Sequence, residues 1–188
     1  MIRFSAALAA LALATPLTAL AHAPSWTLNR AESKLSFTDT QTGKTFKGQF
    51  KKFAAVIAFS PSDLAASHIK VTVDLASAVT GNLQRDSAMR DQDWFDIAKS
   101  PQAIFTSTQI TRLGANTYQA AGTLTLRGIR KKVILPFTVA ITGNTAHATG
   151  HLVLHRIAYG VGQGPWASGA YVGLNVTVTL DIIATEKP

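Results

Sequence analysis

Apolar and polar residues alternate along most of the chain after residue 25, and this alternation constrains the fold more than any other feature. Phe46, Gly48 and Phe50 fall on one face of an extended segment, while Lys47 and Gln49 fall on the other. The same period of two runs through residues 118–126, 133–141 and 172–183. Successive side chains of a β-strand point to opposite faces, so the pattern predicts strands with one buried face.

Turn-forming pairs separate these segments, which predicts consecutive hairpins. Thr42-Gly43, Arg127-Gly128 and Gly143-Asn144 each lie between two alternating runs. Only residues 82–97 break the alternation, and we expect a short helix from Asn82 to Arg90. An all-β, antiparallel barrel or sandwich with one short helical insertion follows. The 47% hydrophobic content favours a barrel whose interior is filled by side chains or holds one ligand, and these two alternatives stay open.

The amino-terminal segment has the pattern of a secretory signal peptide. Arg3 is followed by an apolar run and then by small residues, so we expect residues 1–21 to be removed, or residues 1–23 with the later of two cleavage points. Residues 22–188 would then form one exported, periplasmic domain. The chain has no cysteine, so disulfides and thiol chemistry are excluded. Its net charge of +8 favours anionic lipid over nucleic acid as a binding partner, or serves solubility alone, and both interpretations stay open.

Candidate catalytic and metal-binding groups are few. His147, His151 and His155 recur every four residues, but the intervening Leu152 and Leu154 indicate a strand, on which neighbouring histidines lie too far apart for one metal ion. No G-x-S-x-G elbow is present. We expect no metal site and no enzyme. The rival hypothesis is a hydrolase or isomerase that uses Asp93 or Asp96 inside the barrel.

A basic cluster surrounds Gly128 and comprises Arg127, Arg130, Lys131 and Lys132. One interpretation is a hairpin whose charges protect a strand edge from pairing with another chain. The other is contact with a lipid head group or an anionic membrane. Both remain open at the level of sequence.

Several motifs together resemble the YceI-like family, along the chain from Trp26 almost to Lys187. The most specific are TGNLQRD at 80–86, DWFD at 93–96, PQAIF at 101–105 and GTLTLRGI at 122–129. The segment RIAYG at 156–160 departs from the family pattern, because Ala158 replaces an acidic residue. The segment GQGPW at 162–166 is similar to a branch of the family found beside b-type membrane cytochromes.

The resemblance implies a lipocalin-like antiparallel barrel that holds a polyisoprenoid, such as a prenyl quinone or prenyl pyrophosphate, and catalyses no reaction. Apolar residues of the inward faces would contact the tail, and the basic cluster would contact the head group or the membrane. The expected tail contacts are Phe37, Phe46, Phe50, Phe59, Trp94, Phe95, Phe105, Leu124, Leu126 and Trp166. The alternative is a module without ligand that docks on a b-type cytochrome through Trp166. The oligomeric state is not implied.

Overall fold

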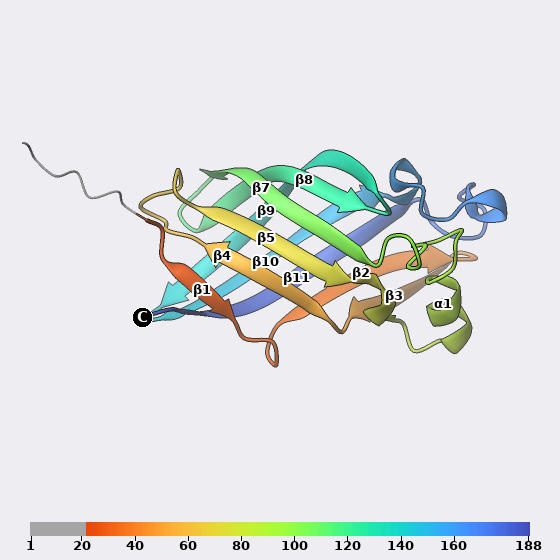
Figure 1. The fold of residues 1–188 in the computed structure, drawn as a ribbon, viewed down its shortest axis with the longest axis horizontal. Coiled ribbons are helices and arrows are strands. Elements are labelled where there is room, and N and C mark those ends of the chain that lie inside the picture. The colour runs from red at the N-terminus through yellow and green to blue at the C-terminus, as the bar shows by residue number, and fades with distance from the viewer. Residues whose placement is uncertain (1–21) are drawn as a thin grey trace, which may run out of the picture.

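One antiparallel sheet closes on itself in the part of the chain that the computed structural model describes, residues 22–188 (Figure 1). Its strands are β1 (Ser25–Leu28), β2 (Lys34–Gln41), β3 (Lys44–Phe50), β4 (Phe53–Ala58), β5 (His68–Asp74), β6 (Ala78–Val79), β7 (Gln102–Arg112), β8 (Thr117–Leu126), β9 (Ile129–Thr142), β10 (Thr145–His155) and β11 (Asn175–Glu186). The predicted all-β, antiparallel barrel is confirmed, and the sandwich alternative is excluded.

Closure depends on β1, which pairs with β11 on one side and with β4 on the other. Trp26 lies opposite Glu186 in the first pairing and opposite Ile57 in the second. Further along β11, β2 takes over the pairing, and β3 pairs with β2. β1 and β2 both pair with β11 and together form one side of the ring, and the consecutive strands β3 and β4 form the next. With β5, β7, β8, β9, β10 and β11 they make a ring of eight long strands.

The inward face of each strand carries the apolar half of the alternation. In β8, Tyr118, Ala120 and Leu126 are buried, while the residues between them are more exposed. Gly122 lies on the same face, where a side chain would meet the Phe105 ring of the neighbouring β7. Gly48 has the same relation to Phe37. These two glycines let aromatic rings of adjacent strands lie close against the barrel wall.

The predicted helix is present as α1 (Leu83–Ala88). The Asn82 side chain accepts a hydrogen bond from the Arg85 amide at 3.0 Å and so caps its amino end. Three short 3-10 turns accompany it: Leu75–Ser77, Arg156–Tyr159 and Gly164–Trp166. Figure 1 shows α1 and the segment that follows β10 at one end of the barrel, with the C-terminus at the other.

The predicted signal peptide, residues 1–21, lies outside the described residues. Between residues 22 and 188 there is no helix with the length and apolar character needed to cross a bilayer.

Candidate ligand-binding cavity

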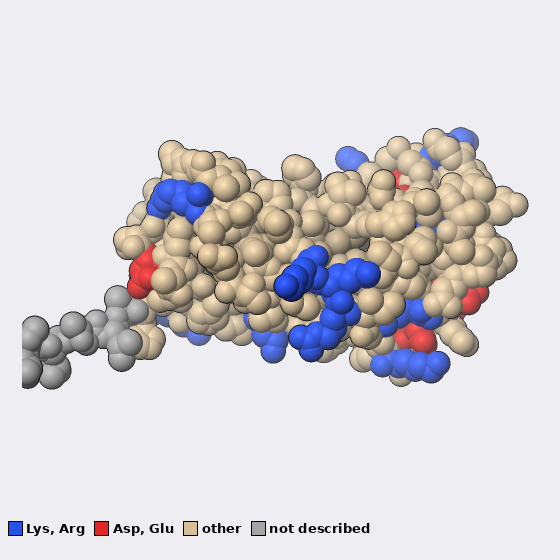
Figure 2. Space-filling model, turned by 90° about the horizontal axis from the view of Figure 1, so that it is seen from above, with Lys and Arg blue, Asp and Glu red and all other residues tan. Residues whose placement is uncertain are grey.

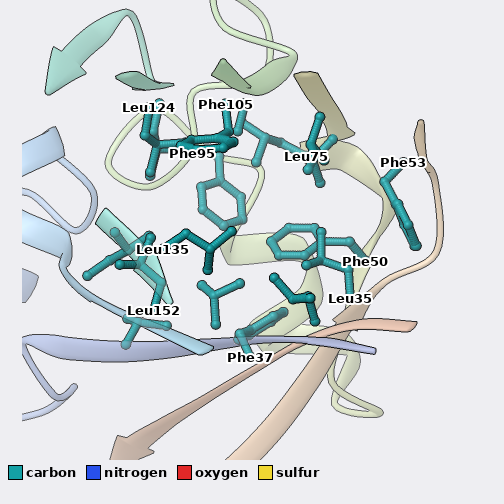
Figure 3. Close-up of a pocket in the computed structure, with 18 of the residues that line it drawn as sticks. Leu35, Phe37, Phe50, Phe53, Leu75, Phe95, Phe105, Leu124, Leu135 and Leu152 are labelled. Atoms are coloured by element: carbon teal, nitrogen blue, oxygen red, sulfur yellow. The ribbon is translucent and has the colours of Figure 1, made fainter. Parts of the chain in front are cut away.

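The barrel encloses a cavity of about 530 Å³, a size typical of sites that bury small apolar ligands. Inward side chains of nearly every strand line it, and almost all of them are apolar (Figure 3). The sequence left a filled and a hollow barrel as alternatives, and the structure shows a hollow one.

All ten residues expected to contact a ligand tail line this cavity: Phe37, Phe46, Phe50, Phe59, Trp94, Phe95, Phe105, Leu124, Leu126 and Trp166. Three of them form a row of rings. The Phe37 and Phe50 ring centroids are 5.2 Å apart, and those of Phe50 and Phe95 are 6.3 Å apart. Figure 3 shows these rings directed into the interior from strands on one side and from the segment after α1 on the other. Whether they contact a ligand is a proposal, taken up below.

Packed aromatic residues close the cavity at the end away from α1. Tyr118 is fully buried; its ring stacks on Phe137 with centroids 5.6 Å apart and meets Phe59 edge-on at 5.2 Å. The Trp26 indole N–H donates to the Phe59 carbonyl at 2.9 Å. Because the rings pack on one another and the Trp26 indole N–H has an acceptor, this end of the cavity is an apolar floor.

Polar side chains enter the lining only at the α1 end. Arg85 donates from Nε to Gln41 Oε1 at 3.0 Å, and its guanidinium lies 3.9 Å above the Phe46 ring. Asn82 and Gln84 complete this polar rim. The cavity therefore has an apolar floor and a polar rim, an arrangement suited to an amphiphile with a long tail.

Arg156 is the most completely engaged polar side chain of the lining. It is 2% exposed and donates to backbone carbonyls of the segment that follows it. Its acceptors are the carbonyls of Gly173 (2.6 Å), Val161 (2.9 Å), Gly162 (3.3 Å), Trp166 (2.6 Å), Val172 (2.9 Å) and Ser168 (3.5 Å). Through these hydrogen bonds, the guanidinium holds residues 156–173 over the end of the barrel.

Asp39 lies in the same lining and is 7% exposed. Burial raises the pKa of the Asp39 carboxyl, while the Thr40 amide at 2.7 Å and the charge of Arg156 act in the opposite direction. Burial likewise lowers the pKa of Arg156, and Asp39 opposes that change. Asp39 on β2 is thus the acidic group whose charge acts on Arg156.

The predicted basic cluster lies elsewhere: none of its four members lines the cavity. Arg127 donates from Nη2 to the Gln92 carbonyl at 2.6 Å and lies 3.9 Å from the Asp96 carboxylate, so it ties the β8–β9 turn to the segment after α1. Arg130, Lys131 and Lys132 are exposed on β9. Contact of these residues with a head group or a membrane remains a prediction.

The acidic residues of the rival enzyme hypothesis do not face the cavity, which corrects that hypothesis. Neither Asp93 nor Asp96 is part of its lining. The Asp93 carbonyl accepts the amides of Gly162 and Gln163, and the Asp96 carboxylate lies near Lys99 and Arg127. The Asp96 carboxylate therefore has charged partners, whereas the contacts of Asp93 are made by its backbone carbonyl.

The histidines are placed as the alternation predicts. His147, His151 and His155 are all exposed on β10. Within residues 22–188, no three His, Cys, Asp or Glu side chains come together as metal ligands would.

None of the six polar lining residues was anticipated as part of the site: Asp39, Gln41, Asn82, Gln84, Arg85 and Arg156. The available signal for Arg156 was an isolated arginine between an apolar strand and a glycine-rich segment. A buried arginine near several glycines often satisfies backbone carbonyls that cannot enter a regular ladder. Asp39 and Arg85 gave no such signal, because each sits within an ordinary polar pattern.

A closed antiparallel barrel around an apolar cavity with one polar end defines the class of small-ligand-binding β-barrels. The chain belongs to the YceI-like family: the model of the YceI-like domain matches residues 26–184. A curated relative is the UPF0312 protein of Pseudomonas savastanoi pv. phaseolicola, which is 31% identical over 181 residues, or 93% of this chain and 83% of the relative. The resemblance inferred from the motifs is confirmed.

Solved structures agree with this assignment. BcnA of Burkholderia cenocepacia superposes with a TM-score of 0.81 at 35% identity, over 84% of this chain and 99% of that protein. A polyisoprenoid-binding domain from Saccharophagus degradans superposes with a TM-score of 0.68 at 16% identity, over 87% and 99% of the two chains. The second comparison supports the fold alone.

Proposed function

We propose that the protein binds a long-chain isoprenoid lipid, a prenyl quinone or a prenyl pyrophosphate, with the tail inside the barrel. The observation that carries this proposal is the cavity inside the barrel, whose walls are apolar from the Phe59 and Phe137 floor to the polar rim at α1. Each buried CH₂-sized unit of a tail contributes about 0.8 kcal/mol, so a long tail gains most in a fully enclosed site. A protein of the same fold from Saccharophagus degradans is described as a polyisoprenoid-binding domain, and our proposal assigns that class of ligand to this chain as well.

The head group would lie at the α1 end. Arg85 has donors beyond the Nε–H that it gives to Gln41, and Asn82 and Gln84 lie beside it on the rim. A guanidinium can bind a phosphate through two charge-assisted hydrogen bonds, and it can also donate a weaker hydrogen bond to a quinone carbonyl. Arg156 is less suitable as a head-group ligand, because backbone carbonyls occupy its donors.

The proposed role is that of a periplasmic carrier rather than an enzyme. The amino-terminal sequence predicts export, and binding alone requires no catalytic group. A carrier of this kind would move an insoluble lipid through an aqueous compartment.

A second candidate is a docking module for a b-type membrane cytochrome, and one feature favours it. Trp166 packs between Trp94 and Tyr171, at centroid distances of 5.8 and 6.3 Å, and Tyr171 is 55% exposed. Exposed aromatic residues are common at protein interfaces. The lipid-binding proposal accounts for the cavity, whereas the docking proposal gives the cavity no role.

The test is mass spectrometry of an organic extract of the mature protein, purified from its periplasm without detergent. A stoichiometric prenyl lipid is expected, and Leu124→Glu should remove it by placing a carboxylate against the tail. Leu113→Glu is the matched control, since Leu113 is 57% exposed outside the cavity. An empty extract, still empty after addition of prenyl quinone and prenyl pyrophosphate, would favour the docking module.

A further inference from the structure

The wall of the barrel is interrupted between β9 and β10. Their ladder runs from Thr142 and Thr145 to Phe137 and Gly150 and stops there. The next residue of β9 is Pro136, which has no N–H to donate. Its carbonyl lies so near Gly150 that a side chain at that position would collide with it. Within the described chain, residues 130–135 pair only with β8, and residues 151–155 pair only with β11.

We call this interruption the β9–β10 window, bounded by residues 130–135 and 151–155. Pro136 and Gly150 close it toward the middle of the barrel. Toward the α1 end, Gly160 closes it, because the side chains of Arg127 and Ile129 lie against that glycine. Six residues of extended chain give the window a length of roughly 16 Å.

The window is apolar through the thickness of the wall. Continuing the register past Phe137 and Gly150 places Leu135 across from Leu152 on the inner side, and both line the cavity (Figure 3). On the outer side it places Ile134 across from Val153, and each is 55% exposed. Apolar side chains therefore lead without interruption from the surface to the cavity.

The surface on the β9 side of the window is basic. On the β11 side, the half-exposed Asp181 lies beside Thr149, one residue pair beyond Gly150, and contacts His147 at 2.7 Å. Arg130, Lys131 and Lys132 are exposed along its β9 rim. Lys132 lies in one row across the sheet with Thr123, Thr106 and Lys70. The sequence from residue 97 to residue 180 contains no Asp or Glu at all; its charged residues are Lys99, Arg112, Arg127, Arg130, Lys131, Lys132 and Arg156.

Figure 2 shows basic side chains gathered over the middle of one face, while the acidic ones in that view lie toward the two ends. Exposed apolar residues flanked by lysine and arginine, with Asp181 already in contact with His147, match the surface of an anionic bilayer.

We propose that the β9–β10 window is a side entrance to the cavity, and that the protein docks this face on an anionic phospholipid bilayer to exchange its ligand. The proposal rests on the lipid-binding function above and adds the route. A tail that enters sideways keeps contact with apolar surface throughout, whereas a tail that enters end-on crosses the polar rim at α1 first. The basic rim holds the window against the membrane while the tail crosses.

The route is tested by closing the window. The chain has no cysteine, so Ile134→Cys with Val153→Cys can be joined selectively by a short bis-maleimide. The matched control is Thr138→Cys with Thr149→Cys, on the same two strands and within the ladder, where the two threonine Oγ1 atoms are 2.9 Å apart. Uptake of ubiquinone from phosphatidylcholine–phosphatidylglycerol vesicles is followed by quenching of tryptophan fluorescence.

Cross-linking the window should slow uptake by about tenfold or more, because the tail must then wait for an opening elsewhere. Cross-linking the control pair should leave the rate unchanged. A cross-linked window with unchanged uptake would overturn the side entrance and leave the proposed function intact. Failure of the uncross-linked protein to take up ubiquinone or a prenyl pyrophosphate would instead count against the proposed function.

The docking surface is tested by neutralising its charges. Replacing Arg130, Lys131 and Lys132 with glutamine should weaken binding to the anionic vesicles about 100-fold, since each basic residue at such a surface contributes about fivefold. Replacing Lys44, Lys47 and Lys51 on and beside β3 removes the same charge elsewhere and is the control. Equal losses in both variants would indicate attraction by net charge and overturn the assignment of this face. If the wild-type protein forms dimers, and the cross-link across the window abolishes them, this face is an interface between two copies of the chain and its assignment to a membrane is overturned.

Discussion

Arg156→Lys should destabilise the segment that covers the α1 end of the barrel. The guanidinium has five N–H groups, and it uses them on six backbone carbonyls between Val161 and Gly173. A lysine keeps the positive charge near Asp39 but offers three N–H groups from a single nitrogen, so two or three carbonyls lose their donor.

The expected loss is about 3–5 kcal/mol, since each buried carbonyl left without a partner costs about 1–3 kcal/mol. This is a large part of the 5–15 kcal/mol that stabilises a typical domain. The carbonyls belong to one surface segment, so part of the loss should appear as local opening of residues 160–174 rather than as global unfolding.

Two measurements check this prediction. Urea unfolding followed by tryptophan fluorescence gives the free energy of unfolding, and hydrogen exchange locates the opening. Arg112→Lys is the matched control, because the exposed Arg112 donates to only two carbonyls, those of Ala115 and Pro61. We expect that control to cost less than about 1 kcal/mol. An Arg156→Lys protein as stable as wild type, with unchanged protection of residues 160–174, would refute the reasoning.

Two further predictions concern the barrel wall and its buried charge. Burial raises the pKa of Asp39 in the folded protein above its ordinary value of about 3.9. The stabilisation that comes from the protonated carboxyl is therefore complete at a pH below the ordinary pKa, and it is lost as the pH rises through the raised pKa of the folded state. Asp39→Asn should therefore flatten the decline of unfolding free energy with rising pH, and an unchanged slope between pH 4 and 8 would contradict this. Gly122→Ala should cost about 1–3 kcal/mol in urea unfolding, because the added carbon meets the Thr106 carbonyl and the Phe105 ring; Gly114→Ala, which meets only ordinary contacts at Thr117, should be tolerated.

The alternation of residues predicted strands within residues 46–50, 118–126, 133–141 and 172–183. These correspond to β3, β8, β9 and β11, although β11 begins three residues later, at Asn175. Phe37, Phe105 and Leu124 were all placed correctly, since a period of two leaves only a choice between two faces. The helix after Asn82 was predicted because its residues break the alternation and begin with a capping side chain. The motifs were sufficient to identify the YceI-like family.

The polar end of the cavity could not be predicted in the same way. Asp39 and Arg156 lie far apart in sequence and come together only because β2 and the end of β10 both border β11. The sequence shows the basic cluster, but it does not show where the cluster lies relative to the cavity and the window, because alternation does not show where a ladder of hydrogen bonds stops. Pro136 is visible in the sequence, yet its effect on the wall depends on which strand lies beside it.

The sequence by itself determined the kind of secondary structure, the apolar face of each strand and the family, because these depend on local periodicity and on short motifs. The tertiary structure decided that the barrel is hollow, that its polar rim lies at α1, and that its wall is interrupted beside Leu135 and Leu152. These features depend on how strands far apart in sequence close into a ring. Closure sets the interior volume and the register of every ladder, and neither is encoded in any single segment.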